Sequence, residues 1–319
     1  MAGRRSRSAE LPFLASFSCL WCGAAHTVRG GDDLEGWAQL CPDCVGRAGD
    51  NGFLRFRLRQ ALQERAGAGG STGTGGRAAT TAPAPAATAA EAPPDLDRTM
   101  IDYYEARAPE YDDWYLRRGR YDRGPIANAV WQSELDRATL WLDSLALGPV
   151  IVELAAGTGW WSPLLAQKGE LWAFDAAEAP LDRARSRLLA HRLRAHLHVR
   201  DAWADPDREA DSLFTGFWLS HLPRADLAPF LALVRRWLKP GGTFAFIDSL
   251  PDPESGAADH ASPTDDRSVR RLADGREFEV TKVYYTPVEL EAALGDAGFA
   301  PADVTTTGRF FLLGRATAR

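Results

Sequence analysis

From residue 150 onward the chain alternates short apolar runs with longer segments in which apolar residues recur every three or four positions. A β-branched run at 150–152 is the first of five predicted β-strands, and the others lie at 171–174, 196–200, 212–220 and 243–248. Before the fifth, Asp226–Leu238 has helical apolar spacing and ends at Lys239-Pro240-Gly241-Gly242, a sequence that stops a helix. Strands that alternate with helices predict an α/β domain with a mostly parallel sheet.

The C-terminal segments follow a different pattern. Residues 278–285 alternate between apolar and polar and predict a strand, 287–297 predict a helix, and 309–313 return to strand character. Residues 250–275 are polar and contain several Pro, Asp and Ser residues. Such a segment is typical either of a lid over a substrate site or of a solvated insertion.

A glycine turn follows the first predicted strand. Residues 152–161 read VELAAGTGWW, so the strand ends at Glu153 and breaks into a turn that contains Gly157 and Gly159. Glycine has no Cβ and lets the backbone come close to a ligand. The second strand ends at Asp175, eighteen residues beyond Gly157, where a carboxylate can accept hydrogen bonds from both ribose hydroxyls. The pattern therefore predicts a ligand that contains a nucleoside.

A dinucleotide and S-adenosylmethionine are the two candidate nucleoside cofactors. A dinucleotide fingerprint requires a third glycine for close packing of helix on strand, and this chain has Ser162 there, after the bulky Trp160 and Trp161. The pattern E-x-x-x-G-x-G that begins at Glu153 resembles instead the first motif of class I S-adenosylmethionine-dependent methyltransferases. K-P-G-G between a late helix and a strand is a second resemblance, and the whole extends over about residues 97–318.

The resemblance implies a Rossmann-like sheet, mostly parallel and closed by an antiparallel C-terminal hairpin, with the cofactor beyond the carboxyl ends of the strands. It implies that Glu153 and the turn hold the methionine portion of S-adenosylmethionine, that Asp175 holds the ribose, and that Asp201 with Trp203 holds the adenine. The complete set of implied cofactor-binding residues is Tyr111, Glu153, Ala155, Gly157, Gly159, Asp175, Ala176, Asp201, Ala202, Trp203 and Trp218.

Two further features bear on the acceptor. Residues 102–115 read DYYEARAPEYDDWY and resemble the N-terminal cap of the small-molecule, quinone-methyltransferase-like branch of this family, in which the tyrosine of A-x-x-Y-D, here Tyr111, lies near the methionine end of the cofactor. Alternatively, these aromatic residues only pack a helix onto the sheet. His221 follows the fourth strand and is the candidate catalytic base, because imidazole titrates near neutral pH. A packing or capping role for His221 is the alternative.

The N-terminal part contains all four cysteines, arranged as Cys19-x2-Cys22 and Cys41-x2-Cys44. Two such pairs at this separation match the spacing of a zinc ribbon, and four thiolates leave no open coordination position, so the predicted zinc is structural. Two redox dithiols or disulfides are the alternatives, and His26 is expected to lie at the surface. The sequence shows neither a signal peptide nor an apolar membrane span, which predicts a cytoplasmic, reducing location with no membrane contact.

Composition separates the chain into three predicted parts. Residues 66–95 are rich in Ala, Gly, Thr and Pro and predict a disordered linker between a zinc-ribbon module at 1–65 and a methyltransferase domain at 96–319. The net charge is −6, and the catalytic part contains only three lysines. Because nucleic-acid binding depends on neutralising phosphates, this favours a small-molecule acceptor. The arginines at 183, 185 and 187 are expected to form a solvated helix face.

Three functions are compatible with these patterns. The first is S-adenosylmethionine-dependent methyl transfer to a small molecule. The second is RNA methylation with the zinc ribbon as a docking module, which the arginines at 55, 57 and 59 keep open because a strand would place them on one face and a helix would scatter them. The third is a cofactor-binding protein without turnover, whose ribbon contacts a protein partner. Asp175→Ala should weaken cofactor binding under all three.

Overall fold

The computed structural model describes residues 96–257, 260 and 265–319, together with the backbone of 16–18 and 25–27. The chain divides into one unit at 1–90 and a second at 91–319. In the first unit, β1 (Ser16–Ser18) pairs antiparallel with β2 (Ala25–Thr27). The four cysteines, His26's side chain, the arginines at 55–59 and the predicted linker lie outside the described residues.

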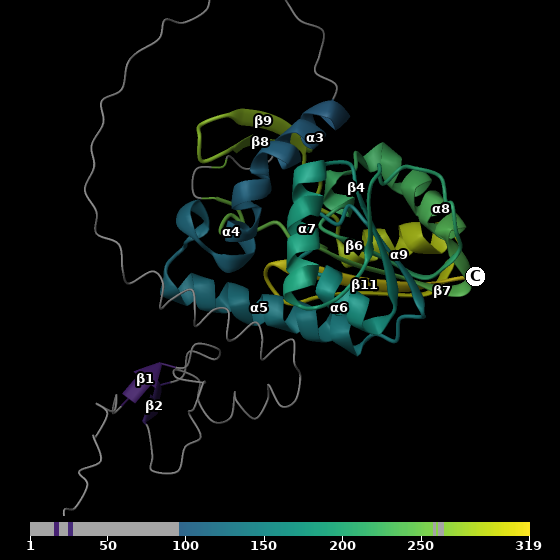
Figure 1. Cartoon of the computed structure of the whole chain (residues 1–319), viewed down its shortest axis with the longest axis horizontal. Helices are drawn as coiled ribbons and strands as arrows, with labels where there is room; N and C mark the ends of the chain where they lie inside the picture. The colour runs from purple at the N-terminus through teal and green to yellow at the C-terminus, as the bar shows by residue number, and fades with distance from the viewer. Residues whose placement is uncertain (1–15, 19–24, 28–95, 258–259, 261–264) are drawn as a thin grey trace, which may run out of the picture. The chain divides into compact units, whose positions relative to one another are not determined.

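A sheet with helices on its two faces forms the centre of the second unit (Figure 1). It has seven strands in the order β10-β11-β7-β6-β3-β4-β5. The strands β3 to β7 pair in parallel, and β11 pairs antiparallel with β7 and with β10. This confirms the predicted Rossmann-like fold with antiparallel C-terminal strands. The strand bounds are β3 (Val150–Leu154), β4 (Glu170–Asp175), β5 (His196–Val199), β6 (Ala210–Gly216), β7 (Leu238–Ser249), β10 (Phe299–Thr306) and β11 (Phe311–Ala318).

Alternate residues of the buried strands point to opposite faces of the sheet, as the period of two requires. On one face Val152, Phe244 and Phe246 pack with α8 (Leu227–Trp237) and α9 (Pro287–Asp296). On the other face Ile151 and Ala245 pack with α5 (Pro125–Ser144) and α6 (Ser162–Lys168). The helix α7 (Glu178–Ala190) connects β4 to β5 beside α6. The sheet is therefore covered on both faces, and its carboxyl edge is left for a site.

An N-terminal cap precedes the sheet. It consists of α3 (Leu96–Arg107), η1 (Ala108–Glu110), α4 (Tyr111–Leu116) and η2 (Gly119–Tyr121). The helix α3 lies beside a separate hairpin formed by β8 (Arg267–Arg271) and β9 (Glu277–Thr281) (Figure 1). Met100 and Tyr103 of α3 pack against Leu272 and Val280 of this hairpin. The polar segment predicted at 250–275 thus contains a strand.

Three local predictions differ from the structure. The fourth strand ends at Gly216 rather than at Ser220, because Phe217 has a φ of 60° and turns the chain, so that His221 lies in the short helix η3 (Leu219–His221). The strand β10 has no counterpart among the predicted strands. Arg187 is not on a solvated face: its guanidinium forms an ion pair with Asp112 of the cap, and both side chains are mostly buried.

Among the described residues, no helix is both long enough and apolar enough to cross a membrane.

Candidate active site

A narrow cleft lies at the carboxyl edge of the sheet. Ten predicted site residues line it, namely Tyr111, Ala155, Gly157, Asp175, Ala176, Asp201, Ala202, Trp203, Trp218 and His221. Met100, Ile101, Tyr104, Ala177, Pro180 and Phe217 also line it. The residues that follow β3, β4, β5 and β6 therefore meet in one place, because parallel strands bring their carboxyl ends to the same edge. The cleft encloses about 70 Å³, and Met100 and Ile101 close it from α3.

Asp175 is fixed by the backbone on both of its oxygens. Its Oδ2 accepts a hydrogen bond from the Gly157 amide at 2.7 Å, and its Oδ1 accepts one from the Ala177 amide at 2.9 Å. Burial raises the pKa of Asp175 to about 6, although these two hydrogen bonds favour the ionised form. Each oxygen keeps a lone pair for a further donor in the cleft.

The backbone conformation of the turn and the space of the cleft both favour a glycine at position 157. Its φ is +55°, and a Cβ on this residue would lie 3.5 Å from the Tyr111 hydroxyl oxygen, in the space of the cleft. Ala155, two residues earlier, has a φ of 53° although it is not glycine. Such a backbone conformation is costly and is maintained only where the surrounding structure imposes it, often at a binding site.

Gly159 is not one of the described residues that line the cleft. A Cβ on it would lie 2.6 Å from the Cβ of Ala184 and 2.9 Å from its Cα. The absence of a side chain at Gly159 therefore lets α7 approach the turn closely. Gly159 thus has a packing role, and the ligand contact that the motif implies for it stays a prediction.

Glu153 also lies away from the cleft. Its carboxyl group is buried beneath the turn, where Oε2 accepts a hydrogen bond from the Ser162 hydroxyl at 2.6 Å. Burial raises the pKa of Glu153 to about 8. The structure thus differs from the expected contact between Glu153 and the methionine portion: this side chain connects the end of β3 to the start of α6.

A second, larger cavity of about 810 Å³ adjoins the cleft. Tyr104, Tyr111, Phe217 and His221 line both cavities. We call these four residues the junction. The cap supplies the two tyrosines, and the loop after β6 supplies Phe217 and His221. Because these four residues line both cavities, a ligand in one cavity would meet a ligand in the other at the junction.

His221 is held on both ring nitrogens. Its Nδ1 lies 2.7 Å from the Thr281 carbonyl oxygen, and its Nε2 lies 2.8 Å from the Tyr104 hydroxyl. Burial lowers the pKa of His221 well below its usual value, and the charge of Lys282 lowers it further. In the neutral ring, Nδ1 must carry the hydrogen that faces the carbonyl, so Nε2 accepts a hydrogen bond from Tyr104.

Residues 151–242 match a family model described as "Methyltransferase domain". The chain contains a class I S-adenosylmethionine-dependent methyltransferase domain. It is similar to DhpI in a structure titled "DhpI-SAH complex structure", at 28% identity over 69% of this chain and 96% of that chain, with a TM-score of 0.54. A second structure, titled "DhpI-SAM-HEP complex", matches at 27% identity over 71% of this chain and 99% of that chain, with a TM-score of 0.56. No curated protein matches the chain.

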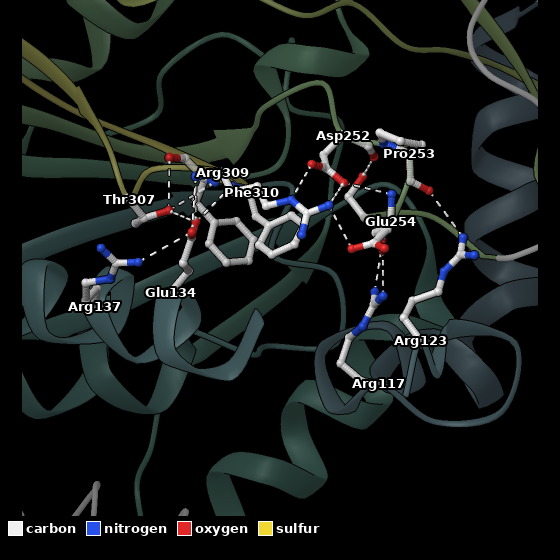
Figure 2. Close-up of polar contacts among 12 residues, drawn as sticks. Arg117, Arg123, Glu134, Arg137, Asp252, Pro253, Glu254, Thr307, Arg309 and Phe310 are labelled. Atoms are coloured by element: carbon white, nitrogen blue, oxygen red, sulfur yellow. Dashed lines mark hydrogen bonds and ion pairs between the residues drawn. The ribbon is translucent and has the colours of Figure 1, made fainter. Parts of the chain in front are cut away.

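One wall of the methyltransferase's larger cavity is fixed by arginines of the cap and of β10–β11. Arg117 donates a hydrogen bond to the carbonyl oxygen of Glu254, and Arg123 donates one to that of Pro253 (Figure 2). Arg117 also donates to the carbonyl oxygen of Ser255, and Arg123 to that of Gly256. Arg309 forms an ion pair with Asp252 at 2.6 Å (Figure 2). Residues 252–256, in the polar segment predicted as a lid or a solvated insertion, are therefore a fixed wall of the cavity.

Arg309 is itself held in place by the helix α5. Glu134 of α5 is buried and accepts hydrogen bonds from the backbone amides of Arg309 and Phe310 at 3.1 and 2.8 Å (Figure 2). The wall of the cavity is thus continuous, through Arg309, with the packed core of the domain.

The sequence patterns missed several residues that line the two cavities. Tyr104 and Phe217 lie at the junction, and the basic residues Arg107, Arg270 and Lys282 line the larger cavity. The sequence could have indicated Lys282, because this lysine lies between Val280 and Val283 in a segment predicted as a strand. Both valines are buried, and so is Lys282.

Proposed function

We propose that this methyltransferase transfers the methyl group of S-adenosylmethionine to a small-molecule acceptor bound in the larger cavity. The observation that carries the proposal is the junction, where side chains of Tyr104, Tyr111, Phe217 and His221 face both cavities. A volume of about 810 Å³ is typical of a site for a drug-sized ligand. The larger cavity is enclosed on one side by the fixed wall at 252–256, which suits a compact acceptor better than a polymer.

The residues of the cleft fit the cofactor. The free lone pairs of Asp175 suit the two ribose hydroxyls, and Asp201 suits the adenine amino group, with Ala202 and Trp203 beside the ring. Gly157 leaves room for the methionine portion near the Tyr111 hydroxyl. Ala155, Ala176 and Trp218 complete the proposed cofactor-binding set. Glu153 and Gly159 support the turn from outside the cleft.

Admission of the cofactor requires a small opening of the cap. The cleft encloses about 70 Å³ with Met100 and Ile101 in place, which is less than a nucleoside needs. These two residues belong to α3, which packs on the β8–β9 hairpin and also contacts α7. We infer that α3 moves outward with this hairpin when the cofactor enters, and returns to exclude water.

The protein must also align the acceptor with the methyl group and remove a proton from the acceptor where it carries one. Bound S-adenosylmethionine supplies an electrophilic methyl group on a sulfonium centre. The junction orients the acceptor toward that centre, and its tyrosine rings offer π-faces that favour a nearby cation. His221 is the proposed base for an acceptor that arrives with a proton, because its neutral Nε2 is an acceptor that Tyr104 connects to the junction.

We propose a structural zinc ribbon in the N-terminal unit. The support is the spacing of Cys19, Cys22, Cys41 and Cys44. The strands β1 and β2 bracket residues 19–24, which include the first pair. Full-length protein should contain one zinc ion per chain by atomic emission, and Cys41→Ser should lose it. Protein without zinc, or with a zinc content that Cys41→Ser leaves unchanged, would refute this assignment.

The function is tested with methyl-labelled S-adenosylmethionine and full-length protein. A small-molecule extract, an RNA preparation and a protein extract are offered in separate reactions. The proposal expects label in the small-molecule reaction alone. Label in RNA would support the alternative in which the ribbon docks RNA, and binding of the cofactor without label in any reaction would support a non-catalytic cofactor-binding protein.

A further inference from the structure

Three basic residues line the larger cavity and contact only neutral groups among the described residues. We call Arg107, Arg270 and Lys282 the cation cluster. Arg107 donates to the Tyr121 hydroxyl at 3.3 Å, and Arg270 contacts Nδ1 of His260 at 3.0 Å. Lys282 donates to the hydroxyl groups of Ser220 and Ser249 at 2.8 and 3.1 Å. Three positive charges thus converge on one space from α3, β8 and the segment after β9.

Arg107 packs against the two tyrosines of the junction. Its guanidinium is 4.5 Å from the centre of the Tyr111 ring and 5.9 Å from that of the Tyr104 ring. The residue is only 9% exposed, and its Nε is a buried donor without a hydrogen-bond partner in the described part of the chain. An unsatisfied donor on a buried charge is costly unless a ligand supplies the acceptor.

The acidic residues that line the same cavity are engaged elsewhere or lie at its rim. Asp252 forms its ion pair with Arg309, and Asp266 lies 3.4 Å from Arg224. Asp265 is exposed. Asp248 stands near Lys282 but does not line the cavity, and its two oxygens accept the amides of Ser220 and Ser249. The inner end of the cavity therefore keeps an excess of positive charge.

This excess acts on the neighbouring titratable groups. Burial, together with the weaker effects of the Arg270 and Arg107 charges, lowers the pKa of Lys282 to about 8, against the opposite effect of Asp248. Burial and Arg270 lower the pKa of His260 to about 4. The positive charges of the cluster thus shift the pKa values of neighbouring groups in one cavity. Such a positive field beside the cleft indicates a binding site for a negatively charged ligand.

We propose that the acceptor is a small organic acid, whose carboxylate or phosphate-type oxygens bind between Arg107, Arg270 and Lys282. This inference rests on the proposed function, since it names the chemical class of the acceptor. Arg107 and Arg270 offer forked donors that match the oxygens of either group, and Lys282 offers a point charge. A neutral acceptor such as a quinol would leave the buried Arg107 and the half-buried Arg270 without an acidic partner in the cavity.

Binding of anions to the full-length protein, saturated with S-adenosylhomocysteine, tests the inference. The probes are inorganic phosphate, methylphosphonate and succinate, with dimethyl succinate as the uncharged match. Saturable binding of an anion is expected, weakened at least ten-fold in Arg270→Gln and in Lys282→Met. The matched control Arg315→Gln removes an exposed arginine of β11 and should leave the affinity unchanged. The ratio between phosphonate and carboxylate affinities identifies which anion the cluster prefers.

The outcomes separate the two proposals. If S-adenosylhomocysteine binds but no anion does, or if both cluster variants keep the affinity of the parent protein, the acid acceptor is wrong and the methyltransferase assignment stands. If S-adenosylhomocysteine fails to bind the parent protein, the proposed function itself fails. Thermal unfolding and S-adenosylhomocysteine affinity of each variant establish that it is folded.

A second measurement uses turnover. A small-molecule extract is separated by anion exchange, and each fraction is offered with methyl-labelled S-adenosylmethionine. Label is expected in products of the retained, acidic fraction. Label confined to the unretained fraction would overturn the inference even if anions bind.

Discussion

The hydroxyl group of Tyr104 donates a hydrogen bond of 2.8 Å to Nε2 of His221, and both side chains lie where the cofactor cleft meets the larger cavity. The two residues are 117 positions apart in the sequence. The contact therefore exists only because the cap folds over the loop that follows β6. It gives the predicted base a polar neighbour where we propose that the methyl group is transferred.

Removal of the Tyr104 hydroxyl tests this arrangement. In Tyr104→Phe, kcat should fall about 10- to 100-fold, because the junction loses the group that connects His221 to the acceptor. S-adenosylhomocysteine affinity should stay within about two-fold. Tyr285→Phe is the matched control, since its hydroxyl bonds the Leu222 carbonyl outside both cavities. Unchanged kcat in Tyr104→Phe would remove the pair from the mechanism.

The two glycines of the turn should respond differently to alanine. Both have a positive φ, so each substitution costs about 1–2 kcal/mol of backbone strain. Gly159→Ala also places its Cβ 2.6 Å from that of Ala184 and should cost about 1–3 kcal/mol more. Gly157→Ala meets only the Tyr111 hydroxyl and should instead weaken cofactor binding. Denaturant unfolding and calorimetry measure both effects, and equal stabilities of the two variants would contradict the packing role of Gly159.

Glu153 should make stability depend on pH. Its pKa is raised from 4.5 to about 8, so the folded state holds its proton more tightly than the unfolded chain. Its contribution is therefore complete below pH 4.5 and is lost as pH rises toward 8. In Glu153→Gln the fall of the unfolding free energy over this range should be smaller, by up to about 1 kcal/mol per pH unit. The surface substitution Glu279→Gln should not change the slope, and a Glu153→Gln slope equal to the parent's would refute the buried, protonated carboxyl group.

The ion pair between Arg187 and Asp112 should stabilise the cap. Their side chains are 16% and 21% exposed, and Asp112 also accepts a hydrogen bond from Thr158 of the glycine turn. Arg187→Gln should lower the unfolding free energy by about 1–2 kcal/mol, after allowance for partial screening. Arg185→Gln, on the same helix, breaks an exposed pair with Asp182 and should cost less than about 0.5 kcal/mol. Equal costs would mean that the cap does not depend on Arg187.

Much of the sheet could be predicted from the sequence, because five strands and the turn have local patterns. The strand-end acids Asp175 and Asp201 were found for the same reason: the carboxyl ends of parallel strands meet at one edge. Ten predicted site residues line the cleft accordingly.

The rest depended on packing that no local pattern records. Glu153 and Gly159 belong to the motif, yet whether they face the ligand or the core is decided by α6 and α7, which pack behind the turn. The cation cluster comes from three separate elements, so its members have no common spacing. The zinc ribbon lies outside the described residues and stays a prediction.

We propose that the cleft at the carboxyl edge of the sheet holds the cofactor through Asp175. The decisive measurement is calorimetric titration of S-adenosylhomocysteine into the full-length protein, Asp175→Ala and the exposed control Asp303→Ala. We expect binding to the parent protein, a loss of affinity of at least about ten-fold in Asp175→Ala, equivalent to about 1.4 kcal/mol, and no change in Asp303→Ala. Equal affinities of the parent protein and Asp175→Ala would contradict it.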